Sequence, residues 1–310
     1  MLAIAIVMAG LFVASYSLVL GRPAPRHIPA GITGEAYLPS DLVPQLEAAT
    51  GGALDFRRFP SASEARGALD EQAIYVAVLG TSDRPQLLLS SAAGVSVARV
   101  LQQAGQRAQR VSPTLEIIDA HPLPPSDPQG LVSFYVMLGG TILGFLSVFQ
   151  LRVYAPQLSL TAWLACLAVL AVVGGMVLAA VVGPLIGALP ASIGMLWLAS
   201  SLEIAASALL ASTMLVLFGG AAIIPTWALL VILGNTSSGG AVAAPLLPGF
   251  FGFVGRFLPQ GATVSILHTA AYFPSAQHSE PFIIQGIWIV GSAAALLLSV
   301  RLRGRSPTGR

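Results

Sequence analysis

Long apolar runs alternate with short polar connections along most of the chain. About 20 consecutive apolar residues cross a bilayer as a helix, and six runs approach that length. They occupy residues 2–20, 131–151, 160–182, 193–217, 220–234 and 282–301. The third run continues apolar to residue 189, so Gly183, Pro184 and Gly187 are expected to break the helix near its far end. The pattern predicts a membrane protein, mainly α-helical, with six transmembrane helices.

The first run, residues 2–20, has an alternative interpretation as a secretory signal peptide. Such peptides normally carry a positive n-region and a small-residue cleavage site. Only Met1 precedes this run, and the stretch that follows it, GRPAPR, is a poor cleavage site. The sequence therefore favours an uncleaved first transmembrane helix.

Residues 21–129 have a different, more polar character. They contain 9 Arg and 11 acidic residues, and they include three short strand-like runs and one amphipathic helix. The expected strands are 73–80, 86–90 and 115–119, and the expected helix is 94–110, with Val95, Ala98, Leu101 and Gln102 near one face. A Pro-rich linker, 121–130, leads back to the apolar region. We expect a small α/β extracytoplasmic domain between helices 1 and 2.

The stretch between the fifth and sixth apolar runs is the most unusual part of the pattern. LGNTSSGGAVAAPLLPGFFGFVGRFLP, residues 233–259, breaks at a Gly/Ser turn, and before Glu280 this connection carries only one charge, Arg256. Residues 245–258 and 261–273 are expected to form two short helices separated by Pro259. Each is too short to span a bilayer, so the sequence predicts a re-entrant helix pair between helices 5 and 6.

These elements define an expected organisation along the chain. It comprises a first transmembrane helix (1–20), an extracytoplasmic α/β domain (21–129), a five-helix transmembrane region (130–303) containing the re-entrant segment 235–275, and a cytoplasmic tail (304–310).

Composition supports the membrane assignment and excludes several kinds of chemistry. The chain is 55% hydrophobic and 9% charged, whereas soluble domains carry about 25% charged residues. Its net charge of +2 does not indicate a nucleic-acid partner. All 15 basic residues are Arg, and without Lys there is no Walker A loop. Cys166 is the single cysteine and the four His lack ligand spacing, so no metal or cofactor is expected.

Basic residues beside the apolar runs predict the orientation. Short cytoplasmic flanks carry an excess of Arg and Lys. Arg152 follows the second run, and Arg301, Arg303, Arg305 and Arg310 follow the sixth. We therefore expect a multi-pass protein of the bacterial plasma membrane, with both termini cytoplasmic.

Glu203 is the candidate for chemistry within the membrane. It is the only acid between Asp127 and Glu280 and lies inside the fourth apolar run. A carboxylate in lipid is expensive and usually faces the bundle or a cavity. With Ser200 and Ser207 it forms a candidate transport path. The alternative is a carboxyl group that is protonated, or hydrogen-bonded to Ser200, Ser207 or a backbone carbonyl. No enzyme is expected, because GNTSSGG lacks the G-x-S-x-G spacing of a nucleophile elbow.

Small residues in the second run form a small-xxx-small pair. Gly140 and Gly144 lie one helical turn apart, and such pairs let helices approach closely. The face is interpreted as packing within the chain, and a dimer face on the same residues is the alternative.

The stretch 234–273 resembles the C-terminal pattern of the YhgE/Pip (phage infection protein) family, which is related to the yeast nitrosoguanidine-resistance protein and to the type-2 ABC exporter permease fold. The matching residues are Gly234, Asn235, Ser238, Gly239, Gly240, Leu247, Pro248, Phe250, Leu258, Pro259 and Gly261. Residues 74–101, with the turn Ser91–Gly94, also look like the external domain of that family. The family's strand after the first span has only a weak counterpart in GRPAPRHIPAGITGEAY.

The resemblance implies a permease subunit that exports a hydrophobic or amphipathic compound, such as a lipid or a drug. It implies a homodimer or heterodimer in the membrane and a separate cytoplasmic ABC ATPase, for which the loop 150–159 is the expected docking site. The alternative is a non-transporting scaffold or accessory protein whose external domain binds an envelope partner.

Overall fold

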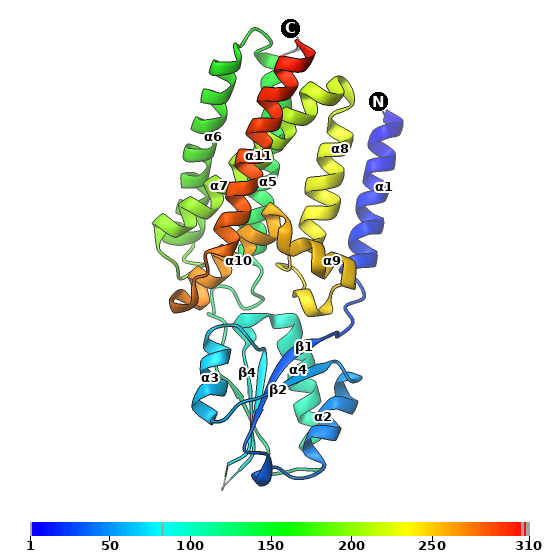
Figure 1. The fold of residues 1–310 in the computed structure, drawn as a ribbon, viewed down its shortest axis with the longest axis vertical. Coiled ribbons are helices and arrows are strands. Elements are labelled where there is room, and N and C mark those ends of the chain that lie inside the picture. Colours follow the sequence, from blue (N-terminus) through cyan, green and yellow to red (C-terminus); the bar gives the residue numbers. More distant parts are fainter. Residues whose placement is uncertain (1, 82–83, 305–306, 308–310) are drawn as a thin grey trace.

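The computed structural model describes residues 2–81, 84–304 and 307, and the chain is mainly helical with one small sheet (Figure 1). Within these residues, four helices are long and apolar enough to cross a membrane. They are α5 (Val132–Tyr154), α6 (Leu160–Ala180) with the π-helical turn η3 (Val181–Leu185), α7 (Ile193–Phe218) with the 3-10 turn η4 (Gly219–Ala221), and α11 (Glu280–Arg303). Arg305 and Arg310 of the predicted tail lie outside the described residues.

Two shorter apolar helices stand beside these four. They are α1 (Leu2–Val19) and α8 (Ile223–Trp227), which continues through the π-helical segment η5 (Ala228–Asn235). All six predicted apolar runs are therefore helical. Helix α7 packs against α5, α6 and α11 and forms the centre of the bundle.

The ends of these helices follow from local sequence. Ser159 and Ser192 precede α6 and α7, and each side-chain oxygen accepts a hydrogen bond from the first helical turn. The predicted break after α6 is confirmed, because Pro184 lies in the π-helical turn and Gly187 adopts a left-handed conformation, with φ of 67°.

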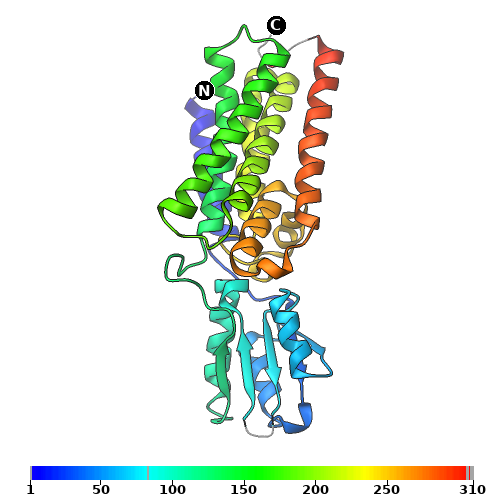
Figure 2. The same ribbon diagram turned by 90° about the vertical axis from the view of Figure 1, so that its left-hand side faces the viewer.

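The sheet and its helices form a separate layer at one end of the bundle, and the start of α1 and the end of α11 lie at the opposite end (Figures 1 and 2). The strands are β1 (Ile28–Thr33), β2 (Leu54–Arg58), β3 (Val76–Leu79), β4 (Gln86–Leu89) and β5 (Glu116–Asp119), in the order β2-β1-β3-β4-β5. Only the β3–β4 pair is antiparallel. Helices α2 (Leu42–Thr50) and α4 (Val95–Ala108) pack on one face, and α3 (Ala62–Asp70) on the other.

The sequence predicted β3, β4, β5 and α4, and these are confirmed. The sequence did not predict β1, which lies in the stretch that is only a weak counterpart of the family's strand. It pairs on both sides, and Ile28 and Ala30 are fully buried. Pro29 and Gly31 lower its strand propensity, and burial between β2 and β3 compensates. The predicted face of α4 also needs correction, because Gln102 is exposed while Val97 and Ala104 join the buried side.

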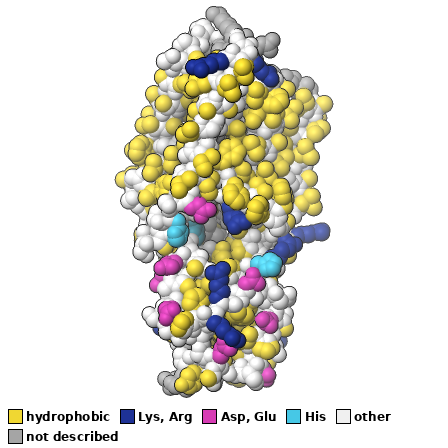
Figure 3. Space-filling view, viewed as in Figure 1, with side chains coloured by type: hydrophobic (Ala, Val, Ile, Leu, Met, Phe, Trp, Pro, Cys, Tyr) yellow, Lys and Arg dark blue, Asp and Glu magenta, His cyan; other side chains and the backbone are white. Residues whose placement is uncertain are grey.

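Polarity differs sharply between the two parts of the molecule. Figure 3 shows hydrophobic side chains over most of the bundle surface, whereas charged side chains gather around the sheet. Large exposed hydrophobic residues include Ile142, Val173, Ile287 and Val290 on three of the long helices. Such a surface is typical of a membrane protein.

Short helices fold back between the bundle and the sheet. They are η6 (Ala244–Leu246), α9 (Gly249–Val254), η7 (Gly255–Phe257) and α10 (Pro259–Tyr272). Both predicted ranges are helical, although 245–258 is divided among η6, α9 and η7. Pro259 is the first residue of α10, where its missing N–H is not needed.

Two glycines allow backbone segments of this region to contact one another directly. A Cβ at Gly255 would lie 1.8 Å from the carbonyl oxygen of Ser237, and a Cβ at Gly261 would lie 2.0 Å from that of Gly255. The chain leaving η5, the turn η7 and the start of α10 are therefore in backbone contact, which no larger residue permits.

The sheet is joined to this region by hydrogen bonds and by a shared core. The N–H groups of Ala24 and Arg26 donate to the carbonyls of Leu246 and Pro245, at 3.1 and 2.9 Å. Ala243 and Leu246 belong to the same buried cluster as β1, α2 and α4. The loop after η5 thus forms part of the core of the α/β layer.

Gly261→Ala is expected to destabilise the protein, by at least about 2 kcal/mol, because overpacking against backbone forces a shift. The matched control is Gly291→Ala in α11, whose added Cβ would meet no atom within 4 Å. Thermal unfolding of the full chain in detergent should show a lower midpoint for Gly261→Ala alone. Equal midpoints for the two variants would contradict the close packing.

Candidate functional site

Glu203 lies in the middle of α7 with no exposed surface, and its carboxylate accepts four hydrogen bonds. Thr141 Oγ1 and Ser207 Oγ donate to Oε1 at 2.7 and 3.1 Å. Thr263 Oγ1 and Gln285 Nε2 donate to Oε2 at 2.6 and 3.3 Å. The donors come from α5, α7, α10 and α11, so four helices meet at one carboxylate.

Glycines on α5 make this meeting possible. A Cβ at Gly140 would lie 3.1 Å from Glu203 Cγ, and one at Gly144 would lie 2.7 Å from the carbonyl oxygen of Ile204. Thr141, next to Gly140, reaches the carboxylate because the two helices approach so closely. The Gly140/Gly144 pair is therefore a packing face within the chain. Helix α7 covers it, so it does not offer the dimer face considered as an alternative.

Gln285 connects the carboxylate to the start of α10. Its Nε2 also donates to the carbonyl of Pro259 at 2.8 Å, at the first residue of that helix. Ser207 contacts Glu203 as part of the predicted group. Ser200 is fully buried, but its hydroxyl has no hydrogen-bond partner among the described residues.

All four contacts donate to the carboxylate, an arrangement that suits the ionised form, which only accepts hydrogen bonds. No basic side chain forms an ion pair with Glu203 in the described part of the chain. Such a group can take up a proton, or exchange one of its donors for a hydroxyl or cation from a ligand. Two cavities, of about 250 and 200 Å³, lie beside the Gly/Ser turn that contains Ser238. Glu203 lines neither of them.

Most of the remaining predicted motif residues lie where the α/β layer meets the bundle, which we call the junction. Pro259 is the exception, because its carbonyl accepts from Gln285, which also contacts Glu203. Ser238 donates to the carbonyl of Asn235 at 2.9 Å and accepts from the N–H of Gly240 at 3.3 Å. Gly239 between them has a φ of 78°, which glycine adopts without strain. These residues form a tight turn after η5.

The residues just before this turn are closely packed, and two prolines mark the starts of the helices that follow it. A Cβ at Gly234 would lie 2.4 Å from Oε1 of Gln260, which is fully buried. Asn235 is buried beside it, and neither amide atom has a partner among the described residues. Pro248 precedes α9 and Pro259 begins α10.

Sequence reasoning missed Thr141, Thr263 and Gln285. Each is an uncharged polar residue within an apolar helix, and Glu203 needed donors of that kind. The missing information was which helix faces which, because hydropathy does not specify the rotation of one helix against another.

Helix α10 contacts Glu203 near one end and the α/β layer near the other. Thr269 Oγ1 accepts from Gln72 at 3.1 Å, and Tyr272 donates to Asp127 at 2.8 Å. Asp127 also accepts from the N–H groups of Leu131 and Val132, at the start of α5. One short helix therefore joins the bundle interior to the layer that carries the sheet.

The sequence predicted no metal site, because its four His and single Cys lack ligand spacing. The described residues contain no group of three or more His, Cys, Asp or Glu side chains placed to hold a metal ion. His268 lies in α10 at the junction, where burial lowers its pKa to about 4, so it is neutral at pH 7.

No protein family, curated protein or solved structure in the comparisons matches this chain. The resemblance to the YhgE/Pip family therefore stays a prediction, and its functional consequences are proposals.

Thr263→Val should destabilise the protein by about 1–3 kcal/mol, because it removes a hydrogen bond to a buried carboxyl oxygen at nearly constant shape. Thr226→Val is the matched control: its hydroxyl is equally buried but donates only to Ala222 of its own helix. Unfolding of the two variants in detergent measures the difference. A smaller loss for Thr263→Val than for Thr226→Val would show that α10 is not held through this bond.

Proposed function

We propose that the chain crosses the membrane six times and places the α/β layer outside. Two shorter apolar helices accompany the four long ones, and the start of α1 and the end of α11 lie at the same end of the bundle, opposite the sheet (Figure 1). Arg152, Arg301 and Arg303 lie in the last turns of α5 and α11. An excess of Arg marks the cytoplasmic side, which supports cytoplasmic termini in a bacterial plasma membrane.

In this arrangement α9 and α10 are re-entrant elements at the outer membrane surface. Phe250, Phe253 and Phe257 are more than half exposed, at 63, 55 and 51%. The guanidinium of Arg256 lies 4.8 Å from the ring centre of Phe253. Exposed aromatic rings beside one cation are typical of a helix at the lipid headgroup level.

The function that the geometry supports best is that of an exporter permease subunit, similar to the type-2 ABC permeases. The observation that carries it is the Glu203 carboxylate, bonded to a short helix that also contacts the external layer. Movement of that layer would reach the membrane interior through α10. The cargo would be hydrophobic or amphipathic, a lipid or a drug, that enters from the bilayer.

Such a subunit needs partners. Without Lys the chain has no Walker A loop, so a separate ABC ATPase would supply the energy. The turn after α5 lies at the end with the termini, and Val153 and Tyr154 are 69 and 79% exposed there. A second copy or a related chain would complete the path, and it would use a surface other than Gly140 and Gly144.

A membrane scaffold that binds an envelope partner is the second candidate. It is favoured by the four hydrogen bonds that Glu203 already receives within the chain, since such a carboxylate also suits a fixed contact that only holds helices together.

Glu203→Gln distinguishes the two candidates. In the source organism, where a partner ATPase would be present, cells that produce the intact chain should lose preloaded Nile red faster than cells without it. Glu203→Gln should abolish this difference because it removes the carboxyl group that holds α10 to α7. Glu280→Gln is the matched control, since that carboxylate is exposed at the start of α11. Efflux of the dye is followed by fluorescence, at equal protein levels in the membrane.

Equal efflux from the intact chain and Glu203→Gln would contradict the transport role. A scaffold would retain its co-purifying envelope protein in both variants and would change dye efflux in neither.

A further inference from the structure

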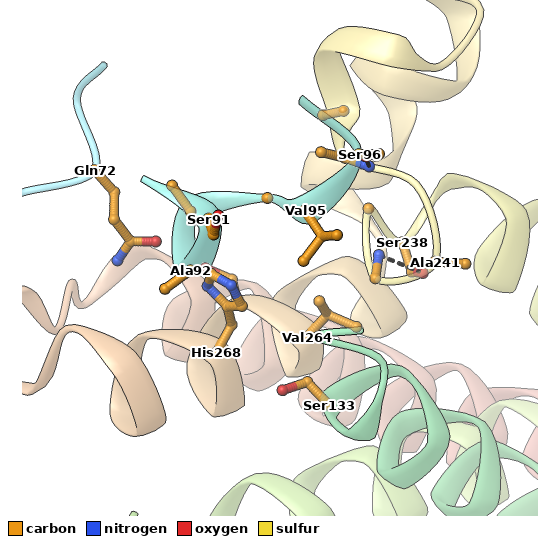
Figure 4. A pocket seen from close by; sticks show the side chains of 18 of the residues that line it. Gln72, Ser91, Ala92, Val95, Ser96, Ser133, Ser238, Ala241, Val264 and His268 are labelled. Carbon is orange, nitrogen blue, oxygen red and sulfur yellow. Dashed lines mark hydrogen bonds between the residues drawn. The ribbon is translucent and has the colours of Figure 1, made fainter. Parts of the chain in front are cut away.

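The larger junction cavity, of about 250 Å³, lies where the α/β layer meets the bundle. Figure 4 shows its walls: residues 91–96 from the layer, the Gly/Ser turn with Ser238, His268 and Val264 of α10, and Ser133 of α5. The cavity is thus bounded by elements from both parts of the molecule. Its volume accommodates several waters or one tetrahedral anion.

The N-terminus of α4 opens on this cavity. Helix α4 has 14 residues, and its N-cap residue, Gly94, provides no side-chain hydrogen bond. The N–H groups of residues 95–97 have no acceptor among the described residues. The first N–H groups of a helix carry a partial positive charge and attract anions. At the start of α5, by contrast, the carboxylate of Asp127 already accepts two N–H groups.

A second and independent feature of the cavity is Ser133. Its side chain lines the cavity and is only 2% exposed, yet its hydroxyl has no partner among the described residues. Buried hydroxyls are normally hydrogen-bonded, because leaving one unpaired is unfavourable. A ligand that accepts hydrogen bonds would satisfy Ser133 and the start of α4 together.

The other walls favour an acceptor ligand. None of the described residues lining the cavity is acidic. Burial raises the pKa of Tyr75 to about 12, so its hydroxyl stays protonated and can donate. Burial lowers the pKa of His268 to about 4, so its ring is neutral. Hydroxyls, N–H groups and a helix end bind tetrahedral oxyanions without any charged side chain.

We propose that this cavity binds a phosphate group through the N-terminus of α4 and the hydroxyl of Ser133. The group comes from a phospholipid head or from free phosphate. The cavity shares Ser238, Gly239 and Ala244 with the smaller cavity, which Gly252 of α9 and Arg256 of η7 line. This proximity to the re-entrant helices favours the lipid. A phosphate there joins the α/β layer to α5 and α10, so it strengthens the junction. The inference concerns a ligand of the junction and does not depend on transport.

The test uses the purified full chain in a neutral detergent, in three arms at constant ionic strength. The first adds sodium phosphate, the second phosphatidylglycerol, and the third a phosphate-free diglucosyl diacylglycerol. Phosphate or phospholipid should raise the unfolding midpoint by about 2–4 °C above the third arm. A shift with phosphate identifies the free ion as sufficient, and a shift with phosphatidylglycerol alone identifies the lipid head. No shift in either arm overturns the proposal.

Two substitutions locate the effect. Val95→Asp puts a carboxylate at the first residue of α4, which suits the helix but repels phosphate, whereas Val95→Asn has the same shape without the charge. Val95→Asp should abolish the shift and Val95→Asn should keep most of it. Ser133→Ala should weaken binding by about tenfold without lowering the ligand-free midpoint, since it removes an unpaired hydroxyl. Full shifts in both Val95→Asp and Ser133→Ala would place the ligand elsewhere.

Discussion

A single carboxylate buried among apolar helices sets the requirements that the rest of the bundle meets. A carboxyl group buried without water needs hydrogen-bond partners on every side, and Glu203 receives them from four helices. The requirement explains why Thr141, Thr263 and Gln285 occur in apolar segments. It also explains the glycine beside Thr141, because only a close approach of α5 to α7 brings that hydroxyl to the carboxylate.

Helix α10 helps to meet this requirement, in addition to connecting η7 with α11. With 14 residues it is about 20 Å long, too short to span a bilayer but long enough to reach from Glu203 to the α/β layer. Its inner part holds the carboxylate through Thr263, and its outer part contacts Gln72 and Asp127. The glycines at 255 and 261 fix where the helix begins. Helix α10 therefore connects the buried carboxyl group to the α/β layer through direct contacts at both of its ends.

The sequence was most informative where one local signal dominates. Apolar length predicted the helices, and Pro184, Gly187 and Pro259 marked where they break or begin. Strand β1 was underestimated, because Pro29 and Gly31 weaken a strand that neighbouring strands then bury. The partners of Glu203 were missed because they depend on how helices are rotated against one another, which hydropathy does not encode. The alternatives for Gly140 were likewise decided only by what packs on it.

Hydrogen–deuterium exchange of the full chain in lipid nanodiscs tests most directly whether Glu203 holds α10. The comparison is between the intact protein and Glu203→Leu, which removes every acceptor at nearly constant volume. If the carboxylate holds α10 in place, amides of residues 259–272 should exchange at least about tenfold faster in the variant, because losing about 1.4 kcal/mol of local stability has that effect. Amides of α6, which has no bond to Glu203, should be unchanged. Equal exchange of α10 in the two proteins would contradict the account.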